Sequence, residues 1–261
     1  MTNPIASAGG GLAFAAAILF IFVGIANFTV HQLVPRHIRL VDLSTQGLGL
    51  LLSNAGAQGR NPGPVYGNPN APSNERSIGD GLRLFYTWGL WNKCAGYSDR
   101  SHPQYCTKNS WAHRFRPTEA LLEDVPNSFR DRAAGLLINQ YNSDTYFGVW
   151  SRIAFYFIFI AACLVGLILL FSLIQARGPG RLGSLNLSLI SLLAFISNTI
   201  GTVIWTAIAG ILKHQLRQNS IGMSANYGNA IWLLWAIDGL LLFASFGYLG
   251  GCIRNRRSNV V

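Results

Sequence analysis

The chain has 261 residues, of which 50% are hydrophobic and only 11% are charged, with a formal net charge of +10. An ordinary soluble domain carries about 25% charged residues, so this composition argues against a soluble globular protein. The apolar residues are concentrated in four blocks, each close to the ~20 residues that a helix needs to cross a bilayer. We therefore predict a membrane protein.

Four spanning helices are predicted from these blocks. Each block contains the ~18 or more apolar residues typical of a spanning helix, and a helix satisfies its own backbone hydrogen bonds, as the bilayer interior requires. Only the fourth block holds a charged residue, Asp238. The predicted spans cover residues 11–30, 153–174, 185–212 and 230–252.

The first span is expected to be retained rather than removed as part of a signal peptide. The segment before it, residues 1–10, contains no Lys or Arg, whereas a signal peptide begins with a positively charged region. The apolar stretch is also longer than the ~7–15 residues of a signal peptide.

The basic residues of the short loops predict the orientation of the spans. Residues 175–184 carry two arginines and the tail, residues 253–261, carries three, whereas residues 213–229 carry one lysine and one arginine. Positive charges accumulate in the cytoplasmic loops of membrane proteins. We therefore expect both termini to lie in the cytoplasm and residues 213–229 to lie outside.

Residues 31–150 then form one long extracytoplasmic loop. It holds 12 Lys and Arg residues against 9 Asp and Glu residues, so the net positive charge lies mainly in arginines next to the membrane, and nucleic-acid binding has no support. A loop of this length is expected to fold into an ectodomain. The exception is residues 58–74, which are rich in Gly, Pro and Asn and predict a flexible excursion.

An aromatic-rich segment of this loop holds its most specific motif. Residues 82–88 alternate as a half-buried strand does and lead directly into the motif. In an oxidising compartment its two cysteines are expected to form a disulfide, which would clamp a hairpin and constrain the unfolded chain by ~3 kcal/mol. The motif consists of Trp88, Gly89, Leu90, Trp91, Cys94 and Cys106.

Two alternatives to the disulfide concern the same cysteines. A metal site would recruit His102 and His113, but the order and spacing of these Cys and His residues fit no ordinary zinc pattern. The other alternative is a pair of free thiols. No metal site is therefore expected.

The GLWxxC…C pattern, in the first outer loop of a four-span chain, resembles the signature of the claudin superfamily. The long loop and the basic tail look more like its fungal branch, the Sur-seven/PalI family. The chain lacks the tryptophan that claudins carry upstream of the GLW residues, and its longer loop argues against the chemistry of tight-junction strands.

This resemblance implies both a fold and a location. The fold would be an all-α membrane protein with a small β ectodomain, in which a claudin-like, left-handed four-helix transmembrane bundle is capped by an extracellular antiparallel sheet. Members of the family are plasma-membrane proteins of cortical patches (eisosomes), or relatives that act in ambient-pH signalling and cell fusion.

An amphipathic helix is predicted for residues 127–141, where it would pack beneath the sheet just before the second span. Its apolar residues share one face; they are Phe129, Ala133, Leu136, Leu137 and Tyr141. For Trp88, Leu90 and Trp91 of the motif, we favour burial in the ectodomain core or anchoring at the membrane interface. Direct contact with a partner is the alternative.

Two polar residues lie near the middle of predicted spans. A charge at the depth of Asp238 is energetically unfavourable and is usually functional, and Asn198 of the third span could hydrogen-bond to it across the bundle. We favour a structural contact of ~1 kcal/mol. An ion or proton pathway would need several such groups in line, and the first two spans offer none.

Small residues spaced four apart mark two spans. Ala162 and Gly166 form one such pair and Gly247 and Gly251 form another, and the pattern permits close approach of helices. We favour packing within the bundle, with oligomerisation as the alternative.

The end of the fourth span combines a cysteine with basic residues. Cys252 lies beside Arg254, Arg256 and Arg257, and a palmitoylated cysteine next to a basic patch is a known two-signal arrangement for membrane attachment. An inert thiol is the simpler alternative.

No catalytic motif occurs in the sequence: it contains no HExxH, GxSxG, Walker or Rossmann pattern. We expect no enzymatic activity and no cofactor. The favoured function is a scaffold that organises cortical patches through contacts with other membrane proteins, with itself and with lipids, including anionic lipids of the inner leaflet and sterol- or sphingolipid-rich domains. The alternatives are an auxiliary subunit or sensor component that tunes a larger membrane protein and, more remotely, a small transporter.

Overall fold

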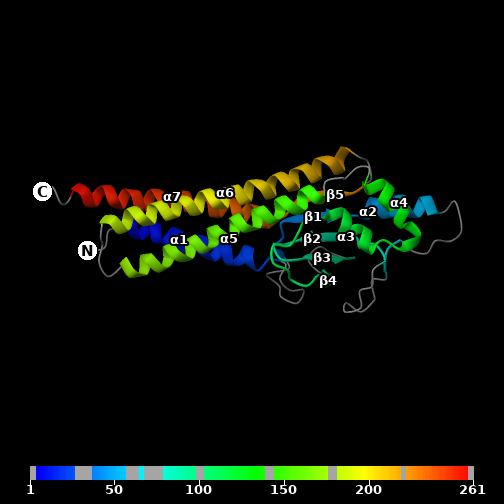
Figure 1. Ribbon diagram of the computed structural model, residues 1–261, viewed down its shortest axis with the longest axis horizontal. Helices are drawn as coiled ribbons and strands as arrows, with labels where there is room; N and C mark the ends of the chain where they lie inside the picture. The colour runs from blue at the N-terminus through cyan, green and yellow to red at the C-terminus, as the bar shows by residue number, and fades with distance from the viewer. Residues whose placement is uncertain are drawn as a thin grey trace. The chain divides into compact units, whose positions relative to one another are not determined.

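The computed structural model describes residues 4–26, 37–56, 65–67, 79–97, 103–138, 144–175, 181–218 and 222–257 (Figure 1). The chain divides into two compact units. The helix unit comprises Met1–Gly24, Ile153–Val203 and Ile231–Val261, and the sheet unit comprises Ile25–Arg152 and Ile204–Ala230. Most of the predicted flexible segment 58–74 lies outside the described residues.

Among the described residues, four helices run alongside one another in the helix unit (Figure 1). α5, α6 and α7 are each long and apolar enough to cross a membrane, and Ala8–Gly24 of α1 forms a shorter apolar helix. This part of the chain confirms the predicted helical membrane bundle. The helices are α1 (Pro4–Gly24), α5 (Asp144–Gln175), α6 (Arg181–Gln218) and α7 (Asn229–Arg257).

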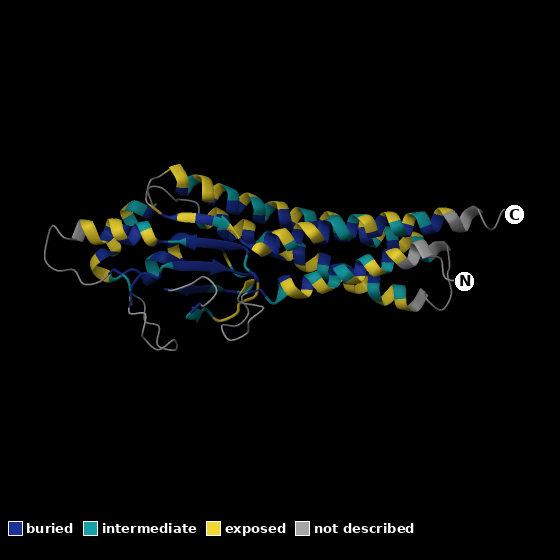
Figure 2. Cartoon of the chain, turned by 180° about the vertical axis from the view of Figure 1, so that it is seen from behind, coloured by how far each residue is buried: buried dark blue, intermediate teal, exposed yellow. Residues whose placement is uncertain are grey.

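The helix α1 is apolar on all sides, as is typical of a buried or membrane-spanning helix. Ala13, Ala16 and Val23 are fully buried, and their spacing places them on one face of the helix. Phe14 and Ile21 on other faces are 58% and 63% exposed. Figure 2 shows the same alternation of buried and exposed residues along the other helices.

Helices α5 and α6 are longer than the spans predicted from the apolar runs. α5 begins at Asp144 instead of residue 153, and α6 covers Arg181–Gln218 instead of residues 185–212. The added residues 144–152 of α5 and 213–218 of α6 belong to the sheet unit, where Phe147 and Leu216 are almost fully buried. Burial of these side chains stabilises helical turns that the apolar pattern does not mark.

The described residues of the sheet unit contain a five-stranded antiparallel sheet with the order β4-β3-β2-β1-β5. This confirms the predicted small antiparallel sheet. β2 begins at Phe85, three residues later than the alternating pattern predicted. The strands are β1 (Val41–Ser44), β2 (Phe85–Trp88), β3 (Lys93–Gly96), β4 (Tyr105–Cys106) and β5 (Ser224–Tyr227).

The edge strand β5 comes from the segment between α6 and α7. It pairs with β1 over its full length, so that Val41 lies opposite Tyr227 and Ser44 lies opposite Ser224. Gly228, directly after β5, approaches the backbone of Arg39 so closely that a Cβ at this position would collide with it. Two segments far apart in the sequence therefore meet in one sheet.

Three short helices complete the sheet unit: α2 (Gln46–Gly56), α3 (Pro117–Asp124) and α4 (Asn127–Ile138). α4 is the predicted amphipathic helix, and it contacts α2 and α3. Phe129, Ala133 and Leu137 are buried as predicted, whereas Leu136 is partly exposed. Tyr141 lies outside the described part of the chain.

Candidate functional site

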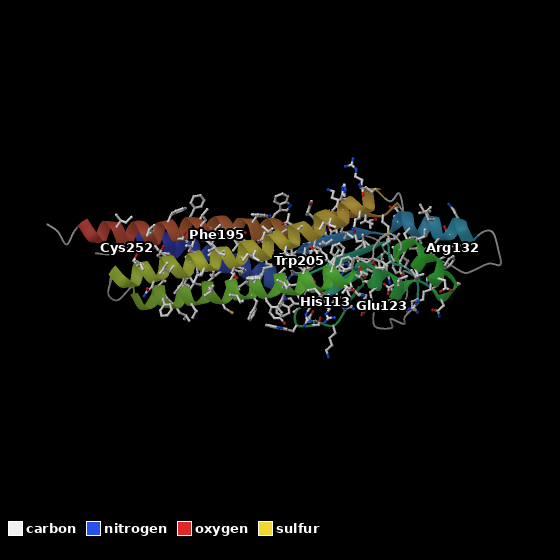
Figure 3. The ribbon with its side chains drawn as sticks, turned by 45° about the horizontal axis from the view of Figure 1, so that its top comes forward. His113, Glu123, Arg132, Phe195, Trp205 and Cys252 are labelled. Carbon is white, nitrogen blue, oxygen red and sulfur yellow. A yellow bond between two sulfur atoms is a disulfide. The ribbon has the colours of Figure 1, made fainter. Side chains whose placement is uncertain are left out.

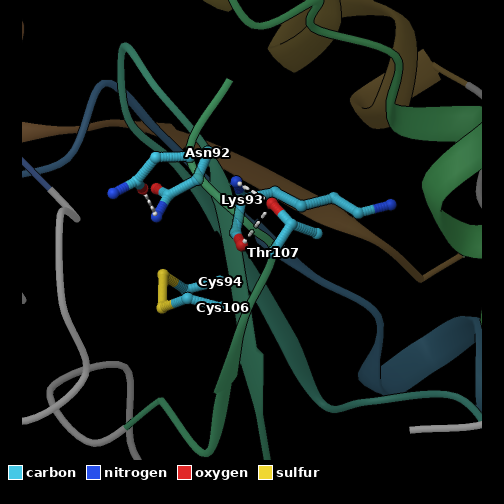
Figure 4. Close-up of a disulfide and its surroundings, with 6 residues drawn as sticks. Asn92, Lys93, Cys94, Cys106 and Thr107 are labelled. Atoms are coloured by element: carbon cyan, nitrogen blue, oxygen red, sulfur yellow. Dashed lines mark hydrogen bonds between the residues drawn. A yellow bond between two sulfur atoms is a disulfide. The ribbon is translucent and has the colours of Figure 1, made fainter.

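The motif residues form a β-hairpin that is clamped by a disulfide. β2 and β3 are joined by a tight turn in which the Gly89 N–H donates to the Asn92 carbonyl oxygen at 3.0 Å. Cys94 on β3 lies directly opposite Cys106 on β4, and the two are disulfide-bonded (Figure 4). The predicted disulfide is confirmed, which excludes the free thiols and a metal site built on these cysteines.

Hydrogen bonds continue this strand pairing past the end of β4 (Figure 4). The Thr107 N–H donates to the Lys93 carbonyl oxygen at 2.8 Å, and the Lys93 N–H donates to Thr107 Oγ1 at 3.0 Å. The Ser110 N–H donates to the carbonyl oxygen of Trp91 at 2.8 Å. The segment after the disulfide is thus held along the motif as far as residue 110.

The aromatic residues of the motif divide between core and surface. Trp88 is only 1% exposed, and its ring packs edge-on against Phe115 at 5.0 Å between centroids. Leu90 is also buried. Trp91 is partly exposed and packs against Trp111, whose side chain is 55% exposed. The motif therefore contributes buried side chains to the core of the sheet unit and an aromatic ring to its surface.

Phe115 joins the motif to the helical turns of the sheet unit. Its ring makes edge-on contacts with Phe147 of α5 and Trp205 of α6, at 5.9 Å between centroids in both cases. Each such aromatic pair contributes about 0.5–1.5 kcal/mol to stability, in addition to the stabilisation that comes from burying the rings. Nothing in the sequence distinguishes these three residues, because an aromatic side chain carries no mark of the ring that it will contact.

A buried polar cluster ties β2 to the end of α3. The Tyr86 hydroxyl donates to Asp124 Oδ2 at 2.7 Å and accepts a hydrogen bond from the Arg83 N–H at 3.2 Å. Burial, together with the neighbouring Asp124 carboxylate, raises the pKa of Tyr86 well above its usual value. The guanidinium of Arg83 lies 4.8 Å from the centre of the Tyr97 ring. These satisfied polar contacts fix the core of the sheet unit.

His113 hydrogen-bonds to a serine of the segment that follows the disulfide. Its Nδ1 lies 2.9 Å from Ser110 Oγ, within hydrogen-bonding distance. Burial, and to a lesser extent the charge of Lys93, lowers the pKa of His113 to about 4. The imidazole is therefore neutral near pH 7. His102, the other residue of the metal alternative, lies outside the described residues.

The helix unit brings Asn198 and Asp238 together. Asn198 Nδ2 donates to Asp238 Oδ1 at 2.9 Å, and Thr199 Oγ1 donates to the same oxygen at 3.0 Å. Asn198 Nδ2 is also 3.1 Å from the carbonyl oxygen of Leu234. Asn198 is fully buried and Asp238 is 4% exposed. The carboxyl group thus lies inside a hydrogen-bonded cluster between α6 and α7.

A serine ladder, formed by Ser184, Ser188 and Ser191, continues this contact along α6. The spacings of four and three residues place the three hydroxyls on one face of the helix. Each hydroxyl donates to a backbone carbonyl oxygen of α7. The acceptors are Tyr248, Ser245 and Leu241, at 2.7, 3.1 and 3.2 Å respectively.

Gly201 and Gly9 approach neighbouring helices closely, although neither belongs to a predicted small-residue pair. A Cβ added at Gly201 of α6 would lie 2.6 Å from Ile158 Cγ1 and 3.0 Å from the Ala154 carbonyl oxygen of α5. Gly9 of α1 similarly approaches α7. At Gly166, in contrast, an added Cβ would meet nothing within 4 Å. Close packing within the bundle, predicted for the pair containing Gly166, is therefore wrong at that residue.

The remaining predicted residues lie at the end of α7. Gly251 is buried and Gly247 is partly buried. Cys252 is only 8% exposed, and a thiol this buried is poorly accessible for acylation, which favours the inert thiol. The side chains of Arg254, Arg256 and Arg257 lie outside the described part of the chain.

Comparisons with known proteins agree with this architecture. A family model described as the SUR7/PalI family matches residues 8–246, which include the apolar stretch of α1, all five strands, the disulfide and the Asn198–Asp238 pair. No curated protein and no solved structure matches the chain. With its long apolar helices and its small disulfide-bonded sheet, the chain is a multi-pass membrane protein that belongs to the SUR7/PalI family.

Proposed function

We propose that the protein is a non-enzymatic organiser of plasma-membrane patches of the eisosome type. It would act through lateral contacts with lipids, with other membrane proteins and with further copies of itself. In this proposal all four helices span the membrane, both termini lie in the cytoplasm and the sheet unit lies outside.

The observation that carries this proposal is that polar side chains of the helix unit hydrogen-bond to neighbouring helices. The three hydroxyls of the serine ladder bind α7, and Ser197 Oγ donates to the Phe157 carbonyl oxygen of α5 at 2.8 Å. Asp238 binds Asn198 and Thr199. Polar groups that hydrogen-bond to neighbouring helices stabilise a bundle and are poorly placed to line a transport pathway.

The outer faces of the same helices support contacts with lipids and membrane proteins. On α7, Trp232, Phe243 and Phe246 are 67%, 64% and 59% exposed, respectively. Large apolar side chains at these positions are compatible with the bilayer interior and with neighbouring helices. The helix unit therefore offers surfaces for lateral association.

The disulfide supports the proposed orientation. Disulfides form and persist in oxidising compartments, so the Cys94–Cys106 bond is consistent with an extracytoplasmic sheet unit. The arginines of residues 175–184 and 253–261 agree with this, because positive charge favours the cytoplasmic side. A maleimide reagent that cannot cross membranes should label a cysteine introduced at Lys108 in intact cells but not one introduced at Ser258.

Patch formation tests the proposed function directly. A fluorescently tagged protein should form stable plasma-membrane patches in its own cell, with slow recovery after photobleaching. In mild detergent, homo-oligomers would support an organiser. A fixed stoichiometric complex with one larger membrane protein would instead favour an auxiliary subunit, and ion or proton flux in liposomes would contradict the proposal.

A further inference from the structure

A cavity of about 340 Å³ lies in the sheet unit, beside the motif hairpin. This volume is within the range of about 300–1,000 Å³ that is typical of ligand sites. His113 and Glu123, two of the residues that line it, are labelled in Figure 3. We call it the basic cavity. Its lining includes Trp88, Lys93, Trp111, Arg114, Arg116 and Arg152.

The basic cavity has more positive than negative side chains. Lys93 Nζ pairs with Glu123 Oε2 at 2.9 Å, and the guanidinium nitrogen Nη1 of Arg116 pairs with Glu119 Oε2 at 2.7 Å. Arg114 and Arg152, in contrast, have no acidic partner among the residues that the structure describes. The unpaired guanidinium groups leave a surplus of positive charge at the cavity wall.

Two buried hydrogen-bond donors of the lining have no acceptor within the described part of the chain. They are Nε1 of Trp88 and Nε of Arg116. Trp88 is 1% exposed, and a buried polar group without a partner is rare in native proteins. A ligand oxygen in the cavity could accept hydrogen bonds from such groups, so the site combines surplus charge with unused donors.

The segment from Arg114 to Arg116 is held in place by contacts with α5. The backbone N–H of Phe115, between Arg114 and Arg116, donates to Ser151 Oγ of α5 at 3.0 Å. Gly148 of α5 lies close to the same segment, since a Cβ there would be 3.2 Å from Arg116 Nε. This arrangement limits the conformational entropy that the arginines lose on binding.

The sequence around Arg152 predicts that this residue of the lining lies near the membrane surface. Arg152 directly precedes the uncharged apolar run that starts at Ile153 in α5. Tyr146 and Trp150, about two turns and one turn of α5 before Ile153, are 52% and 38% exposed, and Trp and Tyr are enriched at the level of lipid headgroups. Trp111 of the cavity lining is exposed as well.

We propose that the basic cavity binds the phosphate group of a lipid headgroup at the membrane surface. Guanidinium groups bind phosphate oxygens through paired, charge-assisted hydrogen bonds, which Arg114 and Arg152 are free to make. The Trp88 and Arg116 donors would add to this contact. A lipid is favoured over free phosphate because Arg152 directly precedes the apolar run of α5. This site does not require patch formation and can be tested independently of it.

Titration of the full-length protein with a water-soluble phospholipid tests the proposal. The protein would be purified in maltoside, a detergent without phosphate, and titrated with dihexanoyl phosphatidylglycerol by calorimetry. The double variant Arg114→Gln/Arg152→Gln should bind at least about tenfold more weakly than the wild type, which corresponds to about 1.4 kcal/mol. The matched control, Lys108→Gln/Arg130→Gln, removes the same charge from exposed residues outside the lining and should bind normally.

Two further ligands and one further variant make the result decisive. Dihexanoyl glycerol, which lacks phosphate, should not bind, and inorganic phosphate should bind more weakly than the lipid. Trp88→Phe keeps an aromatic ring but removes the indole N–H, so it should weaken lipid binding while the disulfide still forms. Equal binding by the two double variants would overturn the phosphate site, and inorganic phosphate binding as tightly as the lipid would overturn the headgroup assignment.

Discussion

The carboxylate of Asp144 accepts a hydrogen bond from the backbone N–H of Glu119 at 2.8 Å and another from Thr118 at 3.2 Å. Asp144 is the first residue of α5, whereas Thr118 and Glu119 lie in the first turn of α3. Arg116, directly before α3, makes no side-chain capping bond of its own. The first residue of one helix therefore caps another helix of the sheet unit.

Removal of this cap should destabilise the sheet unit. Asp144→Ala leaves two backbone N–H groups of α3 without an acceptor, and the loss of an N-terminal cap typically lowers the free energy of unfolding by about 1 kcal/mol. Thermal unfolding in detergent should show a lower midpoint for Asp144→Ala. Asp131→Ala, which removes an exposed carboxylate from α4, should change the midpoint less; equal effects would refute the capping role.

Loss of the disulfide should destabilise the sheet unit more than loss of the Asp144 cap does. Replacement of both Cys94 and Cys106 by Ser releases a constraint on the unfolded chain that contributes ~3 kcal/mol for a loop of this size. The sheet unit should unfold at a lower temperature while the spans remain inserted in the membrane. Cys163→Ser, which changes an exposed free thiol of α5, is the control. Intact-mass measurement of the alkylated, non-reduced protein verifies that the bond is present in the wild type.

The spans and the motif could be predicted from the sequence because each has a local signal. Long apolar runs mark α5, α6 and α7, and the alternating aromatic pattern that ends at Trp88 marks β2. The pairing of β1 with β5 has no such signal. Ser224–Tyr227 is short and mostly polar, and it lies far along the chain from its partner Val41–Ser44.

The contacts between helices of the helix unit could likewise be predicted only in part from the sequence. Asn198 and Asp238 could be singled out because polar residues are rare at mid-depth in a span. Ser184 and Ser191 could not, because a serine in an apolar helix has no evident partner until the facing carbonyl groups are known. Small-residue spacing also misled at Gly166, since the spacing alone does not show which face of a helix meets a neighbour.

The stability of the sheet unit should fall on mild acidification because of His113. Its pKa is about 4 in the folded protein, against 6.5 for an unperturbed histidine. Between these values the unfolded chain binds a proton that the folded chain does not, so the free energy of unfolding decreases as the pH falls from about 6.5 towards 4.

This pH dependence can be assigned by substitution. The unfolding midpoint of the wild type in detergent should drop between pH 7 and pH 5, and His113→Gln should reduce that drop. His214→Gln, a change at an exposed histidine of α6, should behave as the wild type does. An unchanged drop in His113→Gln would assign the effect to other groups.

Asp238 should act as a structural residue. Asp238→Asn keeps an oxygen that can accept from Asn198 and Thr199, so the variant should fold and reach the membrane as the wild type does. Asp238→Leu removes both contacts, each worth about 0.6–2 kcal/mol between membrane helices, and should lower the unfolding midpoint. If Asp238→Asn instead abolished an ion or proton flux in liposomes without any effect on folding, Asp238 would belong to a transport pathway.

The contact between α5 and α6 at Gly201 should tolerate no added methyl group. Gly201→Ala places a Cβ 3.0 Å from the Ala154 carbonyl oxygen and 2.6 Å from the Ile158 side chain. The carbonyl belongs to the helix backbone and cannot move aside alone, so the two helices must separate. Overpacking of this kind lowers the free energy of unfolding by about 1–3 kcal/mol.

Gly166→Ala is the matched control for Gly201→Ala, because both positions lie within apolar helices of the same unit. An added Cβ at Gly166 has open space around it, and alanine favours a helix over glycine by about 1 kcal/mol. Gly166→Ala should therefore leave the unfolding midpoint in detergent unchanged or raise it, whereas Gly201→Ala should lower it. The reverse order would show that α5 contacts its neighbour through Gly166, and a change in oligomer mass caused by Gly166→Ala would identify that face of α5 as a contact between copies of the chain.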